Sequence, residues 1–196
     1  WLYRAIYPGN PWLTPGAVNF LSSHLKPGFS GLEYGSGRST TWFASQVGHL
    51  TSMEHNPEWF NRVSTEIARR GITNISYVHQ PKPDNSLSLD EVRTSAYVTD
   101  VADVQKDSLD FVLIDGVVRP ACALHSIPLL RKGGLLIIDD ANHYLPSSSS
   151  APNSRSIEEG PLNTEWQEVE RQIHGWESIW FGNGIKETAI FKKPLV

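Results

Sequence analysis

The heptapeptide Glu33-Tyr34-Gly35-Ser36-Gly37-Arg38-Ser39 joins two segments of different character. The residues from about Ser30 to Tyr34 predict a buried strand, and the residues from Ser39 to Val47 predict a helix. Glycine accepts positive φ and carries no Cβ, so the two glycines allow a sharp turn and let a ligand approach the backbone. A strand, a glycine turn and a helix in this order are typical of a nucleotide-binding pocket.

The position of Glu54 supports a pocket of this kind. Glu54 comes seventeen residues after Gly37, at the end of the next predicted strand, where a carboxylate can bind a ribose diol. A dinucleotide site needs a third glycine, and Thr40 stands there. Glu33 also places in the turn a carboxylate that would repel a pyrophosphate but suits a ligand with an ammonium and a sulfonium group. An ordinary tight turn would explain a lone G-x-G, but it would not explain why Glu33 and Glu54 both stand at the positions that such a pocket needs.

The E-x-G-x-G pattern of this turn resembles the first motif of class I S-adenosylmethionine-dependent methyltransferases. Asp110 to Gly116 is similar to the fourth motif of that family, and Leu129 to Leu136 is similar to the LL-K-GG turn before its fifth strand. The similarity covers roughly residues 14 to 142. These motifs identify the superfamily and do not name a substrate.

The resemblance implies which residues bind the cofactor, S-adenosylmethionine. Glu33, Gly35 and Gly37 would face its amino-acid part, Glu54 would bind the ribose, and His55 would lie along the adenine. Gln80 stands where the family often has an acidic adenine contact, so the chain departs from the pattern there. The complete expected set is Glu33, Gly35, Ser36, Gly37, Ser39, Glu54, His55 and Asp115.

Hydrophobic patterns and helix caps predict alternating helices and strands over a single domain of 196 residues. Thr14 and Thr164 are the expected N-caps of the first and last helices, the latter in a capping box with Gln167. The resemblance implies a Rossmann-like three-layer α/β sandwich. Its seven-stranded, mostly parallel sheet has the order 3-2-1-4-5-7-6 and an antiparallel last strand. The predicted helices are 14–25, 39–47, 57–71, 119–131 and 164–175, and the predicted strands are 30–34, 49–55, 74–79, 109–116, 135–139, 176–181 and 187–192.

Two segments without a clear pattern remain. Residues 81–106 predict a loop with one or two short helices. The polar segment at about 142–161, rich in serine and proline, predicts a mobile loop at the active edge of the sheet that recognises the acceptor.

Three residues are candidate catalytic bases, because an alcohol or phenol acceptor must lose a proton. Asp115, Asp140 and His143 lie at or just after predicted strand ends on the active edge. Structural alternatives exist here: Asp115 can cap the following helix, Asp139 can order its loop, and His143 can be one exposed histidine among seven.

A metal site is a further alternative. Catechol-type O-methyltransferases, to which this edge is similar, bind Mg²⁺ with an Asp after strand four and an Asp-Asn pair after strand five. Asp115 matches the first ligand and Asp140 the second, but Ala141 follows and the asparagine comes one residue later, as Asn142. This departure disfavours Mg²⁺, so we expect no metal. A bound ion would use Asp115, Asp140 and Asn142.

Composition narrows the class of protein. A hydrophobic content of 39% is typical of a soluble globular chain. A net charge of −4, with no run of Lys or Arg longer than two, argues against a nucleic-acid partner, and the absence of a long apolar run argues against a membrane segment. The single cysteine, Cys122, excludes an internal disulfide and indicates a reducing compartment, which we expect to be the cytoplasm. Nothing in the sequence indicates the oligomeric state.

We therefore expect methyl transfer from S-adenosylmethionine to a small-molecule acceptor, most simply at a hydroxyl group. A dinucleotide-dependent enzyme with the same fold and a non-catalytic cofactor-binding relative are the alternatives. The sequence does not indicate the identity of the acceptor.

Overall fold

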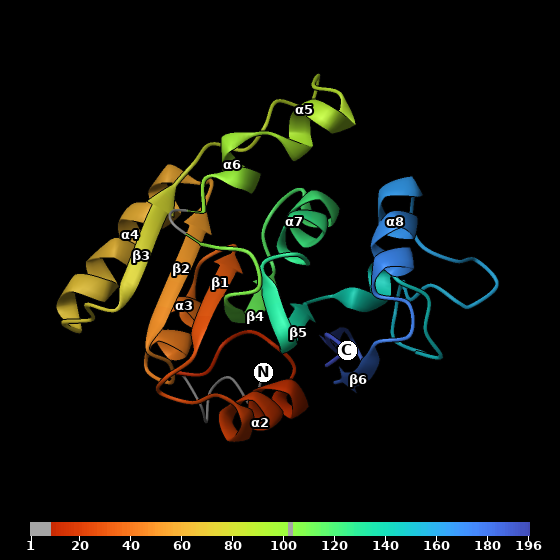
Figure 1. Ribbon diagram of the computed structural model, residues 1–196, viewed down its shortest axis with the longest axis horizontal. Helices are drawn as coiled ribbons and strands as arrows, with labels where there is room; N and C mark the ends of the chain where they lie inside the picture. Colours follow the sequence, from red (N-terminus) through yellow and green to blue (C-terminus); the bar gives the residue numbers. More distant parts are fainter. Residues whose placement is uncertain (1–8, 102–103) are drawn as a thin grey trace.

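The computed structural model describes residues 9–101 and 104–196 and has a seven-stranded sheet at its centre (Figure 1). The strand order is β3-β2-β1-β4-β5-β7-β6, and β7 runs antiparallel to both of its neighbours while the other pairs are parallel. The predicted order and the antiparallel last strand are therefore confirmed. The strands are β1 (Ser30–Tyr34), β2 (His49–Glu54), β3 (Ile75–His79), β4 (Leu109–Ile114), β5 (Leu130–Ile138), β6 (Glu177–Gly182) and β7 (Glu187–Lys192).

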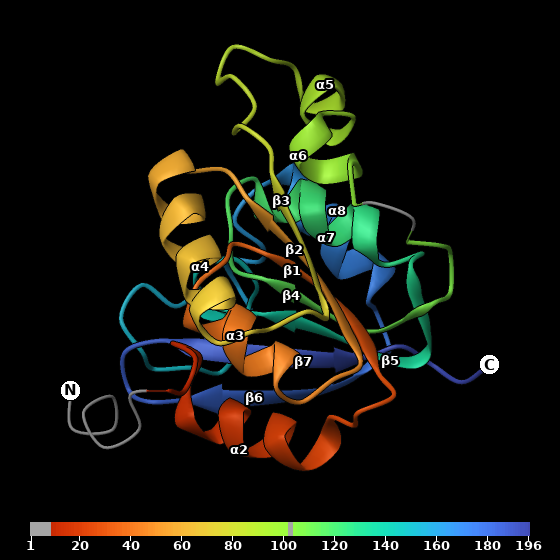
Figure 2. The same cartoon turned by 90° about the vertical axis from the view of Figure 1, so that its left-hand side faces the viewer.

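Helices cover both faces of the sheet and complete the three layers (Figure 2). One face carries α2 (Pro15–His24), α3 (Arg38–Ala44) and α4 (Pro57–Arg69). The other carries α5 (Leu89–Arg93), α6 (Ala96–Thr99), α7 (Arg119–Ser126) and α8 (Thr164–Gln172). No helix in the described ranges is long and apolar enough to cross a bilayer.

The core is divided by the sheet because successive side chains of a strand point to opposite faces. In β4, Phe111 and Leu113 pack with α2 and α3, whereas Val112 and Ile114 pack with α7 and α8. All four side chains are completely buried. A continuous apolar run of this kind is typical of a parallel strand covered on both faces.

Two helix caps show how local sequence sets the element ends. Asn56 accepts a hydrogen bond from the backbone N–H of Trp59 (2.9 Å) and begins α4, as predicted. The prediction for α8 was wrong by one residue. Its N-cap is Asn163, which accepts from the Trp166 N–H at 3.0 Å, and Thr164 is already helical.

The connection between α7 and β5 also differs from the prediction. The helix was predicted to reach Arg131 but ends at Ser126, because Pro128 has no N–H to donate to a preceding helical carbonyl. β5 begins at Leu130, five residues earlier than predicted. Gly133 has a φ of 75°, and the pairing with β4 shifts register between Leu109 and Phe111. A bulge therefore lets the strand continue through the two glycines that were expected to precede it.

The two segments without a clear pattern both have structure. Residues 81–106 contain the short helices α5 and α6, as predicted, although residues 102 and 103 lie outside the described ranges. After β5 comes a short 3₁₀ helix, η1 (Ala141–His143). The chain then folds back, and the Arg155 N–H donates to the Asn142 carbonyl (2.9 Å) while the Arg155 guanidinium donates to the Gly160 carbonyl (2.5 Å). The mobility of this loop stays a prediction.

Candidate functional site

A cavity of about 1350 Å³ lies at the carboxyl ends of β1, β2 and β4. Ligands of open parallel sheets bind beyond this edge. The cavity also extends along α4 as far as Arg70, so one small ligand would fill only part of it. Every residue of the expected cofactor set except Glu33 lines it, namely Gly35, Ser36, Gly37, Ser39, Glu54, His55 and Asp115.

The packing of the backbone itself requires a glycine at position 35. Its φ is +92°, and a Cβ at this position would lie 2.6 Å from the backbone nitrogen of Gly116 and 2.7 Å from the carbonyl carbon of Asp115. A Cβ at Gly116 would in turn lie 2.2 Å from the Tyr97 hydroxyl and 2.9 Å from the backbone nitrogen of Gly35. The turns after β1 and β4 therefore touch through their backbones, which two glycines make possible.

Gly37 has a different reason to lack a side chain. Its φ of 169° is extended backbone open to any residue. A Cβ there would meet only the Trp59 ring, at an ordinary 3.9 Å. Since Gly37 lines the cavity, that Cβ would occupy space in which a ligand can lie. Packing among the described residues therefore does not require a glycine at position 37.

Glu54 is 3% exposed at the end of β2 and accepts four hydrogen bonds. One oxygen accepts from the backbone N–H of His55 (2.9 Å) and of Asn56 (2.8 Å). The other accepts from the Ser36 N–H (3.0 Å) and the Ser36 hydroxyl (2.7 Å). A carboxylate has about four acceptor sites, so a ligand hydroxyl would have to replace one of these donors.

Ser36 is held by two residues that the sequence did not single out. The Trp59 indole N–H donates to the Ser36 carbonyl at 2.7 Å, and the Tyr77 hydroxyl lies 2.6 Å from the Ser36 hydroxyl. The Ser36 hydroxyl therefore has a second partner in Tyr77 if a ligand hydroxyl takes its place on Glu54.

Glu33 lies behind the turn and is completely buried. Its Oε2 accepts from the hydroxyls of Thr40 (2.5 Å) and Ser52 (2.6 Å), whereas Oε1 has no hydrogen-bond partner within the described residues. Burial raises the pKa of Glu33 to about 7, against the opposing effect of hydroxyl donors that include Ser39. Because Glu33 does not line the cavity, its contact with the amino-acid part of a cofactor stays a prediction.

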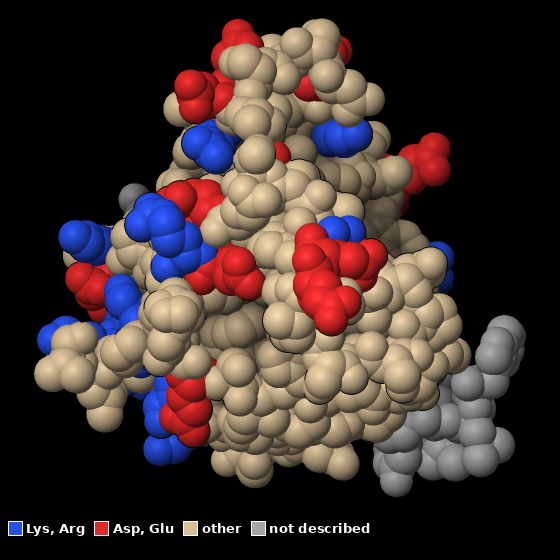
Figure 3. All heavy atoms as spheres, turned by 90° about the vertical axis from the view of Figure 1, so that its right-hand side faces the viewer, with Lys and Arg blue, Asp and Glu red and all other residues tan. Residues whose placement is uncertain are grey.

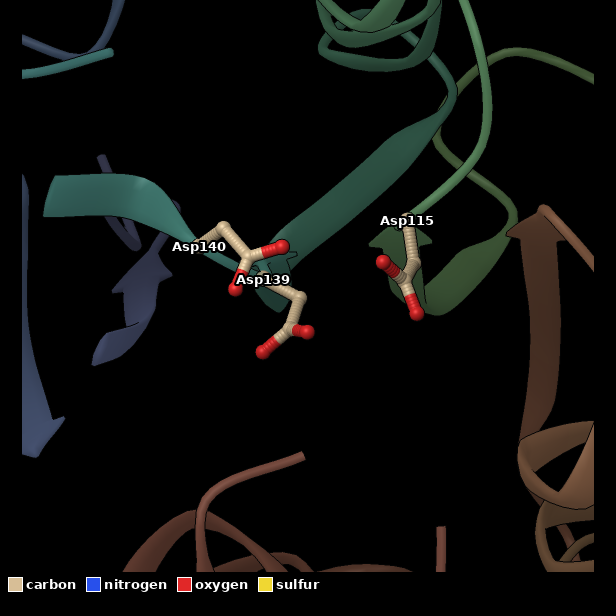
Figure 4. Close-up of side chains that lie close together, drawn as sticks. All are labelled: Asp115, Asp139 and Asp140. Carbon is tan, nitrogen blue, oxygen red and sulfur yellow. The ribbon is translucent and has the colours of Figure 1, made fainter. Parts of the chain in front are cut away.

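Three carboxylates meet beside this cavity, at the ends of β4 and β5 (Figure 4). Asp115 follows β4, and Asp139 and Asp140 follow β5; one oxygen of each lies within 4.8 Å of the others. Burial and the neighbouring Asp139 carboxylate raise the pKa of Asp115 to about 7. Burial likewise raises the pKa of Asp139.

Two cations, neither of them predicted from the sequence, contact the three carboxylates. Arg119 Nη2 lies 2.9 Å from Asp115 Oδ1 and 3.7 Å from Asp140 Oδ2. The Lys186 ammonium forms an ion pair with Asp139 Oδ2 and lies 3.3 Å from Asp140 Oδ1. Arg119 could have been suspected from its position four residues after Asp115, but Lys186 comes from the hairpin between β6 and β7, with no local signal.

The structure separates the other candidates from this cluster. Asn142 is completely buried; its amide oxygen accepts from the Glu187 N–H (2.9 Å), and its amide nitrogen donates to the Ser154 hydroxyl (2.9 Å). The aromatic neighbour of His143 in the described chain is Tyr144, with ring centroids 6.1 Å apart. Thus Asp115 and Asp140 come together. Asn142 instead accepts from the Glu187 backbone, and His143 is not part of the carboxylate cluster.

Comparison with known proteins identifies the fold. Neither a search of protein-family models nor a search of curated sequences found a match. Among solved structures, a methyltransferase-like protein from Silicibacter pomeroyi is 21% identical, with a TM-score of 0.61 over 94% of this chain and 89% of the other. A proposed caffeoyl-CoA O-methyltransferase from Staphylococcus aureus is 18% identical, with a TM-score of 0.58 over 98% and 90%. An rRNA methylase from Streptococcus thermophilus is 11% identical, with a TM-score of 0.56 over 91% and 93%.

The chain has the fold of class I S-adenosylmethionine-dependent methyltransferases. At these identities the likeness establishes the fold and not the reaction. The similar structures include a proposed caffeoyl-CoA O-methyltransferase and an rRNA methylase, so the methyltransferase fold leaves the kind of acceptor open.

Two glycine substitutions should separate packing from ligand binding in this methyltransferase fold. Gly35→Ala should lower the free energy of unfolding by at least about 2 kcal/mol, because its Cβ meets immovable backbone at a positive φ. Gly37→Ala should change stability by less than about 1 kcal/mol but weaken S-adenosylhomocysteine binding at least tenfold. Urea unfolding and calorimetry measure the two effects. Equal ligand affinity in Gly37→Ala and the wild type would show that Gly37 does not face the ligand.

Glu33 should make stability depend on pH. Its carboxyl ionises at about pH 7 in the folded chain and near 4.5 when unfolded, so between these values the folded state holds an extra proton. The free energy of unfolding therefore falls as the pH rises through this window, by about 3 kcal/mol for this group. Glu33→Gln should lose that fall, so its stability relative to the wild type should rise between pH 4.5 and pH 8 in urea unfolding. A constant difference would mean that Glu33 titrates normally.

Proposed function

We propose that this protein transfers the methyl group of S-adenosylmethionine to a hydroxyl group of a small-molecule acceptor. The observation that carries the proposal is that Gly37 and Glu54 face one cavity at the strand ends of a methyltransferase fold. Gly37 leaves room for a ligand, and Glu54 offers a buried carboxylate suited to a ribose diol.

The residues of the cavity fit this cofactor. A ribose hydroxyl would take the place of the Ser36 hydroxyl on Glu54, and the Ser36 hydroxyl would keep Tyr77 as its partner. His55 lines the same cavity, is one-third exposed and has Nδ1 3.1 Å from Glu54 Oε1, and it is the proposed neighbour of the adenine. Bound S-adenosylmethionine would supply a methyl group already activated by its sulfonium, so orientation accounts for much of the acceleration.

Asp115 is the proposed general base for the acceptor hydroxyl. It lines the cavity beside the glycine turn, and its pKa of about 7 is suited to accepting a proton near neutral pH. Arg119 orients its carboxylate from 2.9 Å. The acceptor oxygen gains the methyl group, Asp115 gains the hydroxyl proton, and the donor leaves as a neutral thioether. Asp140 is the second candidate for the base because it shares the Arg119 contact, and His143 is the third.

A small molecule is the acceptor that the charges favour. On the face shown in Figure 3, Lys and Arg side chains are interspersed with Asp and Glu side chains, and the chain carries a net charge of −4. A duplex or single strand of nucleic acid is usually bound by a positive surface. An rRNA methylase has the same fold, so the fold itself does not exclude an RNA acceptor.

Cofactor binding is the first test of the proposal. S-Adenosylhomocysteine at about 100 times its dissociation constant should stabilise the folded chain by roughly 2.7 kcal/mol, a clear shift in thermal unfolding. Glu54→Gln, which retains the size of the side chain, should reduce the shift, and NADH should give none. Stabilisation by NADH in place of S-adenosylhomocysteine would favour the dinucleotide alternative, and no shift with either would favour a non-catalytic relative.

Loss of the base should affect the rate more than binding. With an acceptor found by screening phenols and alcohols against methyl-labelled S-adenosylmethionine, Asp115→Asn should lower kcat by about 10²- to 10⁴-fold. Its affinity for S-adenosylhomocysteine should change by less than tenfold. Wild-type kcat should fall below about pH 7, where the base is protonated, and the residual activity of the variant should lose this dependence. An unchanged pH profile in Asp115→Asn would assign the base to another group.

A further inference from the structure

The three carboxylates at the ends of β4 and β5 have the chemistry of a divalent-cation site. Asp115, Asp139 and Asp140 each offer one oxygen within 4.8 Å of the other two, and their side chains face a common space (Figure 4). Carboxylate oxygens are the ligands that Mg²⁺ and Ca²⁺ prefer. The donor set therefore raises the question of which cation balances its charge.

Two cationic side chains of the protein, Lys186 and Arg119, already contact these three carboxylates. The Lys186 ammonium contacts both aspartates of β5, and the Arg119 guanidinium lies 2.9 Å from Asp115 and 3.7 Å from Asp140. Both cations are held in place. Lys186 is 17% exposed, and Arg119 also donates to the carbonyls of Gly116 (3.0 Å) and Asp139 (2.5 Å).

A resident metal ion does not fit this arrangement. Even with all three carboxylates ionised, the two fixed cations leave a net charge of only about −1, so a divalent ion would have to displace the Lys186 ammonium from Asp139. The other oxygen of Asp139 already accepts from the Thr188 hydroxyl at 2.7 Å. The amide oxygen of Asn142, the third ligand that a bound ion would have used, already accepts a hydrogen bond from the Glu187 backbone N–H.

We propose that Lys186 and Arg119 take the place of a divalent metal ion at the Asp115–Asp139–Asp140 cluster. The positive charge at this edge of the sheet is then supplied by side chains of the protein. Lys186 is then a positioning residue that holds Asp139 and Asp140 in place, as a metal ion would. That the cluster borders the acceptor site rests on the proposed function, whereas its occupation by Lys186 does not.

The arrangement has a simple electrostatic consequence. An ammonium is a compact point charge that can serve several carboxylates at once. With all three carboxylates ionised, removal of the Lys186 charge would leave them with one guanidinium and a net charge of about −2, while one oxygen of each still lies within 4.8 Å of the others. The variant should therefore bind a divalent ion that the wild type does not.

Manganese binding to the intact chain tests the proposal. Mn²⁺ is titrated into the wild type, Lys186→Met and the control Lys192→Met, and free Mn²⁺ is measured by electron paramagnetic resonance. Lys192 is the last residue of β7 and pairs with Glu177 (3.5 Å) at the surface. We expect Lys186→Met to bind one Mn²⁺ per chain at least tenfold more tightly than the wild type and the control. Adding Asp140→Asn to Lys186→Met should abolish the gain.

Two outcomes would overturn the proposal. One is a wild-type chain that binds one Mn²⁺ and loses it in Asp140→Asn, and the other is a folded Lys186→Met with no gain. Lys186→Gln is the second variant if Lys186→Met does not fold, and the wild-type titration decides by itself if neither folds. Thermal unfolding with S-adenosylhomocysteine, in EDTA and in Mg²⁺, tests cofactor binding separately. Absence of any shift there would refute the proposed function and leave the manganese result standing.

Discussion

The backbone contact between the turns after β1 and β4 is the constraint on which the site depends. A side chain at Gly35 would lie 2.6 Å from the Gly116 nitrogen, so the two strand ends can approach only because both positions are glycine. This contact brings Ser36 and Gly37 beside Asp115 at one edge of the sheet. The cavity, the Glu54 carboxylate and the proposed base Asp115 share an edge because this packing is possible.

A second constraint is the cost of burying acids. Glu33 and Asp115 each have a pKa raised to about 7 because burial disfavours their charged forms. The protein offsets this cost differently at the two places. Hydroxyl donors surround Glu33, whereas Arg119 and Lys186 supply full positive charges to the aspartates. At the sheet edge, carboxylates beside the glycine turn are therefore met by hydrogen-bond donors, whereas those beside β5 are met by cations.

The sequence predicted the parts of the fold that depend on local pattern. The strand–glycine–helix unit and the position of Glu54 agree with the structure because each is encoded within a few dozen residues. The strand order spans the whole chain; it was implied by the family resemblance and agrees as well. The end of α7 was wrong because the apolar periodicity continued past Pro128, where the helix cannot. Lys186 was missed for another reason. It meets Asp139 from 47 residues away, and nothing in the sequence around a hairpin lysine indicates such a partner.

The position of Lys186 along the chain also bears on the order in which the protein is made. Domains are synthesised from the N-terminus, so β1 to β5 leave the ribosome while the last hairpin is still to come. During that interval Asp139 and Asp140 have no ammonium partner, and β5 has a free edge until β7 enters between it and β6. The residues of the glycine turn are therefore synthesised well before the ionic edge can be completed, which requires that Lys186 has been added.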